Sequence, residues 1–501
     1  MFEKLFGIKQ KKSSLKNEII GGIFTFITMC YILPVNAQML SEGLHMDRTG
    51  VFVITALASF AISLFMGFFA NVPMALSAGM GINAFLAYTV SNVIGGTWQQ
   101  SMLILTISGI LFFILSLTPL RKMIIESIPK DLKAIISAAL GGFIMFVGLK
   151  NSGIITASSS TLVALGTLGD PAILVALIAV LVTIGFMFSK VKILNTLAIP
   201  FGILLAAVAG IITSEVMISV GALSNNNLDA AWKYTLEGPL KDVVTNLPIA
   251  PWRDMDVLKM FNPIETFSTI PHVFMYGLFD GYTIGQLGND FVQMVQNPAS
   301  YISIFSLIFV SLFVSTATLI TVGSNIGLID KEGKMVNYKR AVIADASGAL
   351  VAAPLGTSSI TCFVESNVGV SLGSRTGLSA IVTGLMFLLS VFIFPVFSIF
   401  IAGSVTVPAL VCVGLLILKG GFEDLNFKDP LMVFTALIMT IFCILTYSIS
   451  DGIGIGLIAY VIMMLFSKRG KEVGVPIYVI TGLFVVAFIA STIIRFLPAG
   501  V

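Results

Sequence analysis

The sequence contains fifteen long apolar segments, separated by stretches that are polar or charged. Many of them approach the roughly 20 residues that an α-helix needs to cross the hydrocarbon core of a bilayer. A bilayer admits only segments whose backbone polar groups are satisfied internally, so the pattern predicts an all-α polytopic membrane protein. The segments cover residues 19–40, 51–70, 73–90, 101–119, 134–149, 171–189, 194–214, 299–322, 341–355, 358–372, 376–396, 399–418, 430–449, 451–467 and 475–494.

The composition excludes several other classes of protein. Of 501 residues, 57% are hydrophobic and only 11% are charged, whereas a soluble domain carries about 25% charged residues. The net charge of +3 is too small to indicate a nucleic-acid partner. Four cysteines, all inside apolar segments, and two histidines predict no disulfide framework, metal site or cofactor. No catalytic residues and no phosphate-binding glycine-rich loop are found, so neither an enzyme nor an ATP-driven pump is expected.

The charges between the segments predict an orientation in the cell membrane. Residues 1–18 are basic, and lysines and arginines recur in every second gap, which places the N-terminus and those gaps in the cytoplasm. The interval from Glu215 to Asp290 holds nine acids and four bases, so it is expected outside. The predicted parts are a cytoplasmic segment (1–18), a first half of seven spans (19–214), an external loop region (215–298), a second half of seven spans (299–467) and a C-terminal segment (468–501) with a possible extra helix.

Seven spans, an external interval and seven more spans suggest a 7+7 inverted repeat of about 14 transmembrane helices. Inverted repeats are typical of secondary transporters, whose substrate sites lie where broken helices meet near the bilayer midplane. The third segment (73–90) and the tenth (358–372) occupy equivalent places in the two halves, and both are interrupted by glycines. We therefore expect broken third and tenth helices, with the substrate site beside them.

Polar residues next to these breaks are the candidate site residues. Glu365 is a carboxyl group in an apolar span, which indicates a functional site by default, although a buried ion pair or a helix cap is the alternative. Asn83 follows the glycines of the third segment, and its alternative role is a hydrogen bond that joins two helices. Thr357 and Ser358 either line the substrate path or serve only to pack small side chains.

Several longer motifs resemble one known family. The strings are GGIFTFITMCYILPVNAQML (21–40), GMGINAFLAYTV (79–90), GLKNSGI (148–154), GTSSITCFVESNVGVSLGSRTGL (356–378) and TYSISDGIGIGLIAY (446–460). In this order they resemble the AzgA-like purine permeases, within the wider nucleobase–ascorbate transporter group. The resemblance covers nearly the whole chain apart from the interval between the seventh and eighth segments.

The resemblance implies a fold and a function. The fold has fourteen helices, with a core domain of spans 1–4 and 8–11 and a gate domain of spans 5–7 and 12–14 that move in an elevator-like way on a dimer scaffold. The function is symport of a purine nucleobase such as hypoxanthine, guanine or adenine, usually with protons. The family's site asparagine falls on Asn83, its proton-coupling glutamate on Glu365, and its helix-nine acid on Asp345.

Helix eight departs from the family pattern. Two aspartates are usual there, whereas this chain has Ser311 and Val314. Ser311 can still bind substrate through a hydrogen bond, but it cannot titrate. Because the site has fewer acids, a transporter of a different heterocycle or of an anion on the same fold is an alternative function. A sensor that binds its ligand without transporting it is a further alternative.

Overall fold

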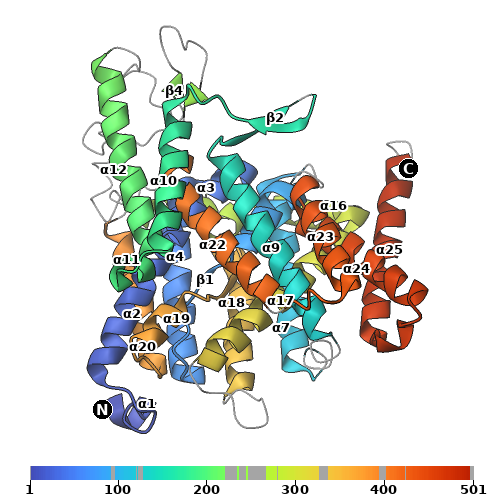
Figure 1. Cartoon of the computed structure of the whole chain (residues 1–501), viewed down its shortest axis with the longest axis horizontal. Coiled ribbons are helices and arrows are strands. Elements are labelled where there is room, and N and C mark those ends of the chain that lie inside the picture. Colours follow the sequence, from blue (N-terminus) through green and yellow to red (C-terminus); the bar gives the residue numbers. More distant parts are fainter. Residues whose placement is uncertain are drawn as a thin grey trace.

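The computed structural model describes residues 2–91, 96–119, 121, 128–158, 160–220, 234–235, 244–245, 267–278, 280–325, 337–393, 402–423 and 425–496. Long helices dominate this part of the chain (Figure 1). In the first half they are α2 (Leu15–Met29), α3 (Ile32–Leu44), α4 (Arg48–Phe65), α7 (Trp98–Leu117), α9 (Lys130–Asn151), α10 (Pro171–Met187) and α12 (Ala198–Ser219). In the second half they are α17 (Pro298–Asn325), α18 (Tyr338–Leu355), α20 (Gly377–Val391), α22 (Gly403–Glu423), α23 (Pro430–Leu445), α24 (Ile449–Phe466) and α25 (Val475–Phe496).

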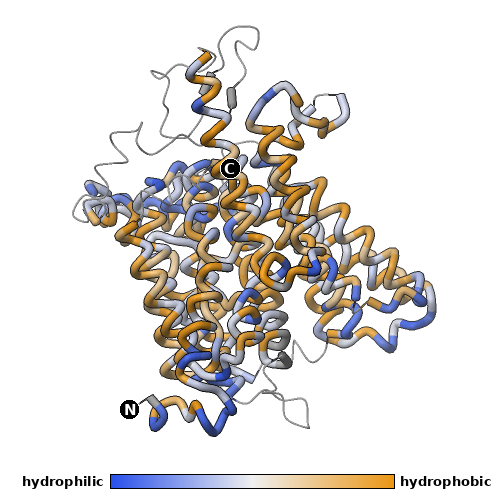
Figure 2. Tube along the Cα trace, turned by 60° about the vertical axis from the view of Figure 1, so that its left-hand side comes forward, coloured by the Kyte–Doolittle hydropathy of each residue, from blue (hydrophilic) through white to orange (hydrophobic). Residues whose placement is uncertain are grey.

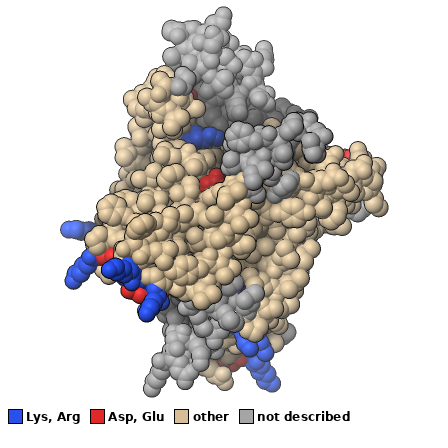
Figure 3. All heavy atoms as spheres, turned by 90° about the vertical axis from the view of Figure 1, so that its right-hand side faces the viewer, with Lys and Arg blue, Asp and Glu red and all other residues tan. Residues whose placement is uncertain are grey.

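Eight of the described spans are long and apolar enough to cross a membrane. Figure 2 shows hydrophobic residues along the length of most helices and hydrophilic residues mainly at their ends. On the face seen in Figure 3, most Lys and Arg side chains lie toward the lower end, below a broad surface with few charges. The expected all-α polytopic membrane protein is therefore confirmed, while the count of fourteen spans and the 7+7 symmetry stay predictions. The possible extra helix at 475–494 coincides with α25.

Polar side chains begin many of these apolar helices. The side chains of Asp47, Asp170 and Asp429 accept backbone N–H groups in the first turns of α4, α10 and α23. Such caps satisfy N–H groups that have no partner within the helix. Ser448 does the same for α24 by accepting the N–H of Asp451. Asp451 therefore lies in the first turn of a helix with a regular N-cap.

The third and tenth segments are broken, as their glycines predicted. Each begins with a short strand: β1 (Leu76–Ala78) leads into α5 (Met80–Ala84) and the π-helix η2 (Phe85–Val90), and β6 (Ile360–Cys362) leads into α19 (Ser366–Ser371). The two strands pair antiparallel, with Ser77 opposite Thr361. This pairing satisfies backbone groups that would otherwise be left without partners inside the membrane.

Helix α18 passes close to the strand pair. A Cβ atom on Gly348 would lie 2.5 Å from the carbonyl oxygen of Ile360, so only glycine allows this approach. Gly356, which ends α18, has φ +100°, a backbone conformation that glycine adopts without steric cost. Together these glycines place β6 directly against α18.

The predicted external loop region contains helical structure where it is described. It holds α15 (Ile270–Val273), the 3₁₀-helix η5 (Phe274–Gly277) and α16 (Ile284–Gln296). Gln100 of α7 donates a hydrogen bond to Asp290 of α16 (2.8 Å), so this part packs on the helical bundle. The sequence favours a solvated loop over a lid for Pro248, Pro251 and Trp252 of this region, and these residues lie outside the described part of the chain. The remaining short elements are α1 (Phe2–Phe6), η1 (Met66–Ala70), β2 (Ile155–Ser158), β3 (Leu162–Leu165), α11 (Lys192–Thr196), β4 (Tyr234–Thr235), β5 (Val244–Thr245) and η7 (Gly470–Glu472).

Candidate functional site

The paired strands bring the two principal candidate residues into one region. Asn83 lies in α5, just after β1. At the end of β1 the backbone N–H of Gly79 donates a hydrogen bond to the carbonyl oxygen of Ser359 (2.9 Å), which ties the start of α5 to the tenth segment. Glu365 is three residues beyond the end of β6 and immediately precedes α19. Because β1 and β6 are antiparallel, the chain leaves them in opposite directions, so Asn83 and Glu365 stand at the two ends of the strand pair.

Glu365 is held by a tyrosine from the first span. The hydroxyl of Tyr31 donates a hydrogen bond to Oε1 of Glu365 (2.8 Å). Tyr31 lies at the junction between α2 and α3 and is only 3% exposed, whereas Glu365 is half-buried. The Glu365 side chain makes no capping hydrogen bond to α19, and it has no ion pair among the described residues. Within the described part of the chain, Glu365 therefore forms neither the buried ion pair nor the helix cap that were the alternatives to a functional role.

Asn83 belongs to a buried hydrogen-bonded cluster. Its Nδ2 donates to Oδ1 of Asn36 on α3 (2.6 Å). Asn36 in turn donates through Nδ2 to the hydroxyl oxygens of Thr55 (2.7 Å) and Thr357 (2.9 Å), and these two hydroxyls are 2.7 Å apart. All four residues are 0% exposed. The alternative predicted for Asn83 was a hydrogen bond that joins two helices. The Nδ2 group of Asn83 makes such a bond, from α5 to α3.

Two buried polar atoms in this region have no protein partner. Within the described residues, Oδ1 of Asn83 and Oγ of Ser358 make no hydrogen bond although both are buried. Buried polar atoms are almost always paired, so these two atoms are candidates for binding a polar ligand. Thr357, by contrast, is fully engaged with Asn36 and Thr55, so it contributes to the site through that cluster.

Asp345 of α18 is hydrogen-bonded to strand β6. Its Oδ1 accepts hydrogen bonds from the hydroxyl of Thr361 (2.9 Å) and the backbone N–H of Cys362 (2.9 Å). Its Oδ2 accepts one from the hydroxyl of Ser315 on α17. The acid from helix nine therefore fixes β6 to α18 and α17.

A buried arginine completes this support. Arg121 is 2% exposed, and its guanidinium donates to the hydroxyl of Ser315 (2.6 Å), which links it to Asp345. It also lies 4.9 Å from the ring centre of Phe112. The sequence pattern pointed to Arg121 only as one of several cytoplasmic charges, because nothing in the sequence shows that it folds back onto α17.

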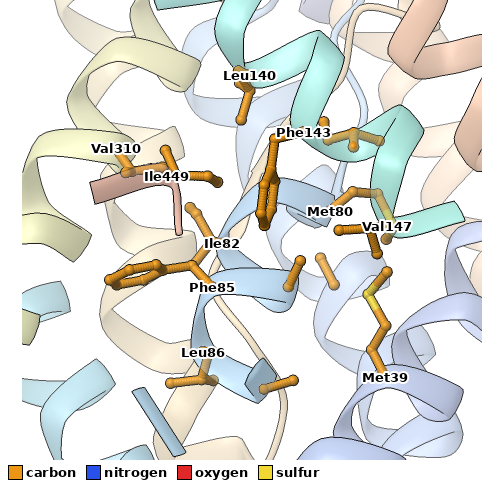
Figure 4. Packing of buried hydrophobic residues seen from close by; sticks show 14 of the residues in the cluster. Met39, Met80, Ile82, Phe85, Leu86, Leu140, Phe143, Val147, Val310 and Ile449 are labelled. Carbon is orange, nitrogen blue, oxygen red and sulfur yellow. The ribbon is translucent and has the colours of Figure 1, made fainter. Parts of the chain in front are cut away.

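Ser311 lies one helical turn before Ser315 on α17 and is 8% exposed. Through Val310, α17 also contributes to the hydrophobic core packed around α5 (Figure 4). In that view Val310, next to Ser311 in the chain, lies near Ile449, and Phe143 of α9 points toward α5. These residues belong to the packed hydrophobic core, and Ser311 is a buried polar residue next to it on α17.

Comparisons with known proteins agree with this architecture. A family model described as "Permease family" matches residues 16–455, so the chain belongs to this family, that of the nucleobase–ascorbate transporters. The chain is therefore a transporter rather than an enzyme. The guanine/hypoxanthine permease PbuG of Bacillus subtilis (strain 168) is 36% identical over 96% of this chain and 97% of its own. The adenine permease AdeP of Escherichia coli (strain K12) is 30% identical over 98% and 96%. The family membership predicted from the sequence motifs is confirmed.

Solved structures show the same fold at low sequence identity. The transmembrane domain of a cyanobacterium bicarbonate transporter, BicA, superposes with a TM-score of 0.54 at 13% identity, over 87% of this chain and 97% of that domain. SLC26A9 gives a TM-score of 0.54 over 91% of this chain and 67% of its own. These likenesses concern the fold alone.

Proposed function

We propose that this protein is a cell-membrane permease that carries purine nucleobases such as hypoxanthine, guanine or adenine. The observation that carries the proposal is the pair of hydrogen-bonding groups at the ends of the strand pair, in a chain whose full-length relatives are guanine/hypoxanthine and adenine permeases. The Glu365 carboxylate accepts an N–H of the base, and Oδ1 of Asn83 accepts a second one. Ser358 and Ser311 supply further polar contacts.

We further propose that transport is coupled to protons through Glu365 and follows an elevator-like motion. An ionisable group inside the membrane is typical of proton pathways. In this mechanism spans 1–4 and 8–11 form the core domain, spans 5–7 and 12–14 form the gate domain, the N-terminus is cytoplasmic, and the protein works as a homodimer.

The second candidate is a carrier of a different heterocycle or of an anion. The replacement of both helix-eight acids by Ser311 and Val314 favours it, because the site then repels an anion less. The Glu365 carboxylate at the same site opposes it.

Uptake of radiolabelled purines into cells without their own permeases tests the proposal. We expect saturable hypoxanthine uptake that falls at least about tenfold in Glu365→Gln, since a hydrogen bond to a charged group is worth about 1.5–3 kcal/mol. Glu423→Gln is the matched control, because Glu423 is exposed and forms a surface ion pair with Lys419. Uptake that survives a proton uncoupler would contradict proton coupling. An absence of purine uptake by protein present in the membrane would favour the second candidate.

A further inference from the structure

The orientation of a buried amide is set by the protons that its neighbours have available. Thr55 has one hydroxyl proton, and its oxygen lies 2.5 Å from the carbonyl oxygen of Val51 one turn earlier in α4. A carbonyl oxygen cannot donate, so the Thr55 proton must lie in this contact. The Thr55 oxygen is then left to accept from its other two neighbours, Thr357 and Asn36.

The proton count fixes Asn36. The single hydroxyl proton of Thr357 is needed for the 2.7 Å contact with Thr55, so neither hydroxyl has a proton left for Asn36. The Asn36 atom that lies within 2.9 Å of both hydroxyls must therefore be the NH₂ nitrogen. Its oxygen then faces Asn83.

Asn83 follows in the same way. Two amide oxygens 2.6 Å apart would repel one another, so Asn83 must present its nitrogen to Asn36. Its own oxygen is turned away from the cluster, and this is the buried oxygen that has no partner among the described residues. The hydrogen bond from the Thr55 hydroxyl to the Val51 carbonyl thus determines that the oxygen of Asn83, and not its nitrogen, is left for a ligand.

We propose that Thr55 and Asn36 are positioning residues that hold the Asn83 carbonyl oxygen toward the substrate, so that the site selects a base carrying N–H at that edge. The inference rests on the proposed function. It adds that the subsite at Asn83 presents a hydrogen-bond acceptor and therefore requires a donor on the base. A base with a bare ring nitrogen at that edge would place two acceptors face to face and leave both unpaired, which is costly when they are buried.

Thr55→Val provides the critical variant. Valine has nearly the shape of threonine but no hydroxyl, so Thr357 can donate to Asn36 and the Asn36 amide can turn over. Asn83 can then turn over as well and offer its NH₂ group to the ligand. The variant should therefore relax the preference for N–H at one edge of the base and leave the edge bound by Glu365 unchanged.

The experiment measures inhibition of radiolabelled hypoxanthine uptake by two pairs of bases. The first pair is hypoxanthine and unsubstituted purine, which lacks both the N1–H and the C6 oxygen of the pyrimidine ring. The second pair is hypoxanthine and its analogue with a ring oxygen in place of the imidazole N–H. In wild type we expect both analogues to bind at least about tenfold more weakly. In Thr55→Val one of the two ratios should fall about tenfold while the other keeps its wild-type value.

Two controls separate orientation from packing. Thr55→Ser keeps the hydroxyl and should keep both ratios. Ser59→Ala removes a buried hydroxyl one turn further along α4, whose partner is Ser77 of β1 (2.8 Å) and not the cluster; it should also keep both ratios. Asn36→Ala frees Asn83 by another route and should reproduce the Thr55→Val result if the valine variant does not accumulate.

The outcomes distinguish this inference from the proposed function. If no purine competes in wild type, the proposed function fails. If purines compete but wild type binds both members of either pair equally, or if Thr55→Val and Asn36→Ala retain both wild-type ratios, the inference about Asn83 is overturned while the function stands.

Discussion

At the scale of single residues, Tyr31 is a direct hydrogen-bond partner of the proposed coupling acid. Its hydroxyl donates to Oε1 of Glu365, and no other side chain in the described part of the chain donates to this carboxylate. A half-buried carboxylate that loses its hydrogen-bond donor is both less well placed and less well solvated. Tyr31 therefore acts on the substrate through Glu365.

We expect Tyr31→Phe to raise the KM for hypoxanthine by about three- to tenfold, which corresponds to the loss of one hydrogen bond of about 1 kcal/mol. Concentration-dependent uptake measures this change. Tyr460→Phe is the matched control, because Tyr460 is equally buried but its hydroxyl has no partner within the described part of the chain. An unchanged KM in Tyr31→Phe, or an equal rise in both variants, would contradict the assigned role.

The sequence could identify some of these residues but not the others. Glu365 and Asn83 stand out because polar groups beside glycine breaks in apolar spans are unusual. Tyr31, Asn36 and Thr55 look like ordinary members of apolar helices, and their importance comes from contacts between distant positions. The bond between Tyr31 and Glu365 joins residues 334 positions apart, and no local pattern encodes such a contact.

At the scale of elements, the strand pair depends on how closely α18 approaches it. The glycines in the third and tenth segments predicted that both helices are broken. The antiparallel pairing and its register were not predictable, because the two strands lie far apart in the sequence and are only three residues long. The same holds for Asp345, whose family position was recognised but whose three hydrogen bonds to β6 and α17 follow only from the fold.

Gly348→Ala tests this packing. The new Cβ atom would lie 2.5 Å from the Ile360 carbonyl oxygen, so β6 or α18 must move. Overpacking of this kind costs about 1–3 kcal/mol, and here it would displace the strand that leads to Glu365. We expect a lower melting temperature in detergent and a loss of most hypoxanthine uptake.

Gly185→Ala in α10 is the control for a helical glycine, because, apart from the adjoining backbone of α10, no atom of the described residues lies within 4 Å of its added Cβ. Alanine also has a higher helix propensity than glycine by about 1 kcal/mol, so this variant should be as stable as wild type or more so. Equal uptake by the two variants would show that the approach of α18 to β6 is not required for transport.

At the scale of the whole molecule, one cluster joins parts that we assign to different domains. Nζ of Lys150, near the end of α9, lies 4.7 Å from the ring centre of Tyr88 in η2 and 5.2 Å from that of Tyr447 before α24. Asn151 donates a hydrogen bond to the Tyr88 hydroxyl (3.2 Å), and Thr89 donates one to the Tyr447 carbonyl (3.0 Å). η2 belongs to the proposed core domain, whereas α9 and α24 belong to the proposed gate domain.

An elevator-like motion requires these contacts to break in each cycle, since the core must slide past the gate. We expect a cross-link between Tyr88→Cys and Asn151→Cys, made in membranes with a short bifunctional thiol reagent, to reduce hypoxanthine uptake to background. Reductive cleavage of the linker should restore it. Each single variant treated in the same way is the control, because three of the four native cysteines are buried and the fourth is half-buried. A cross-linked protein that transports at the untreated rate would show that η2 and the end of α9 stay together throughout the cycle, and the boundary between the moving parts would then have to lie elsewhere.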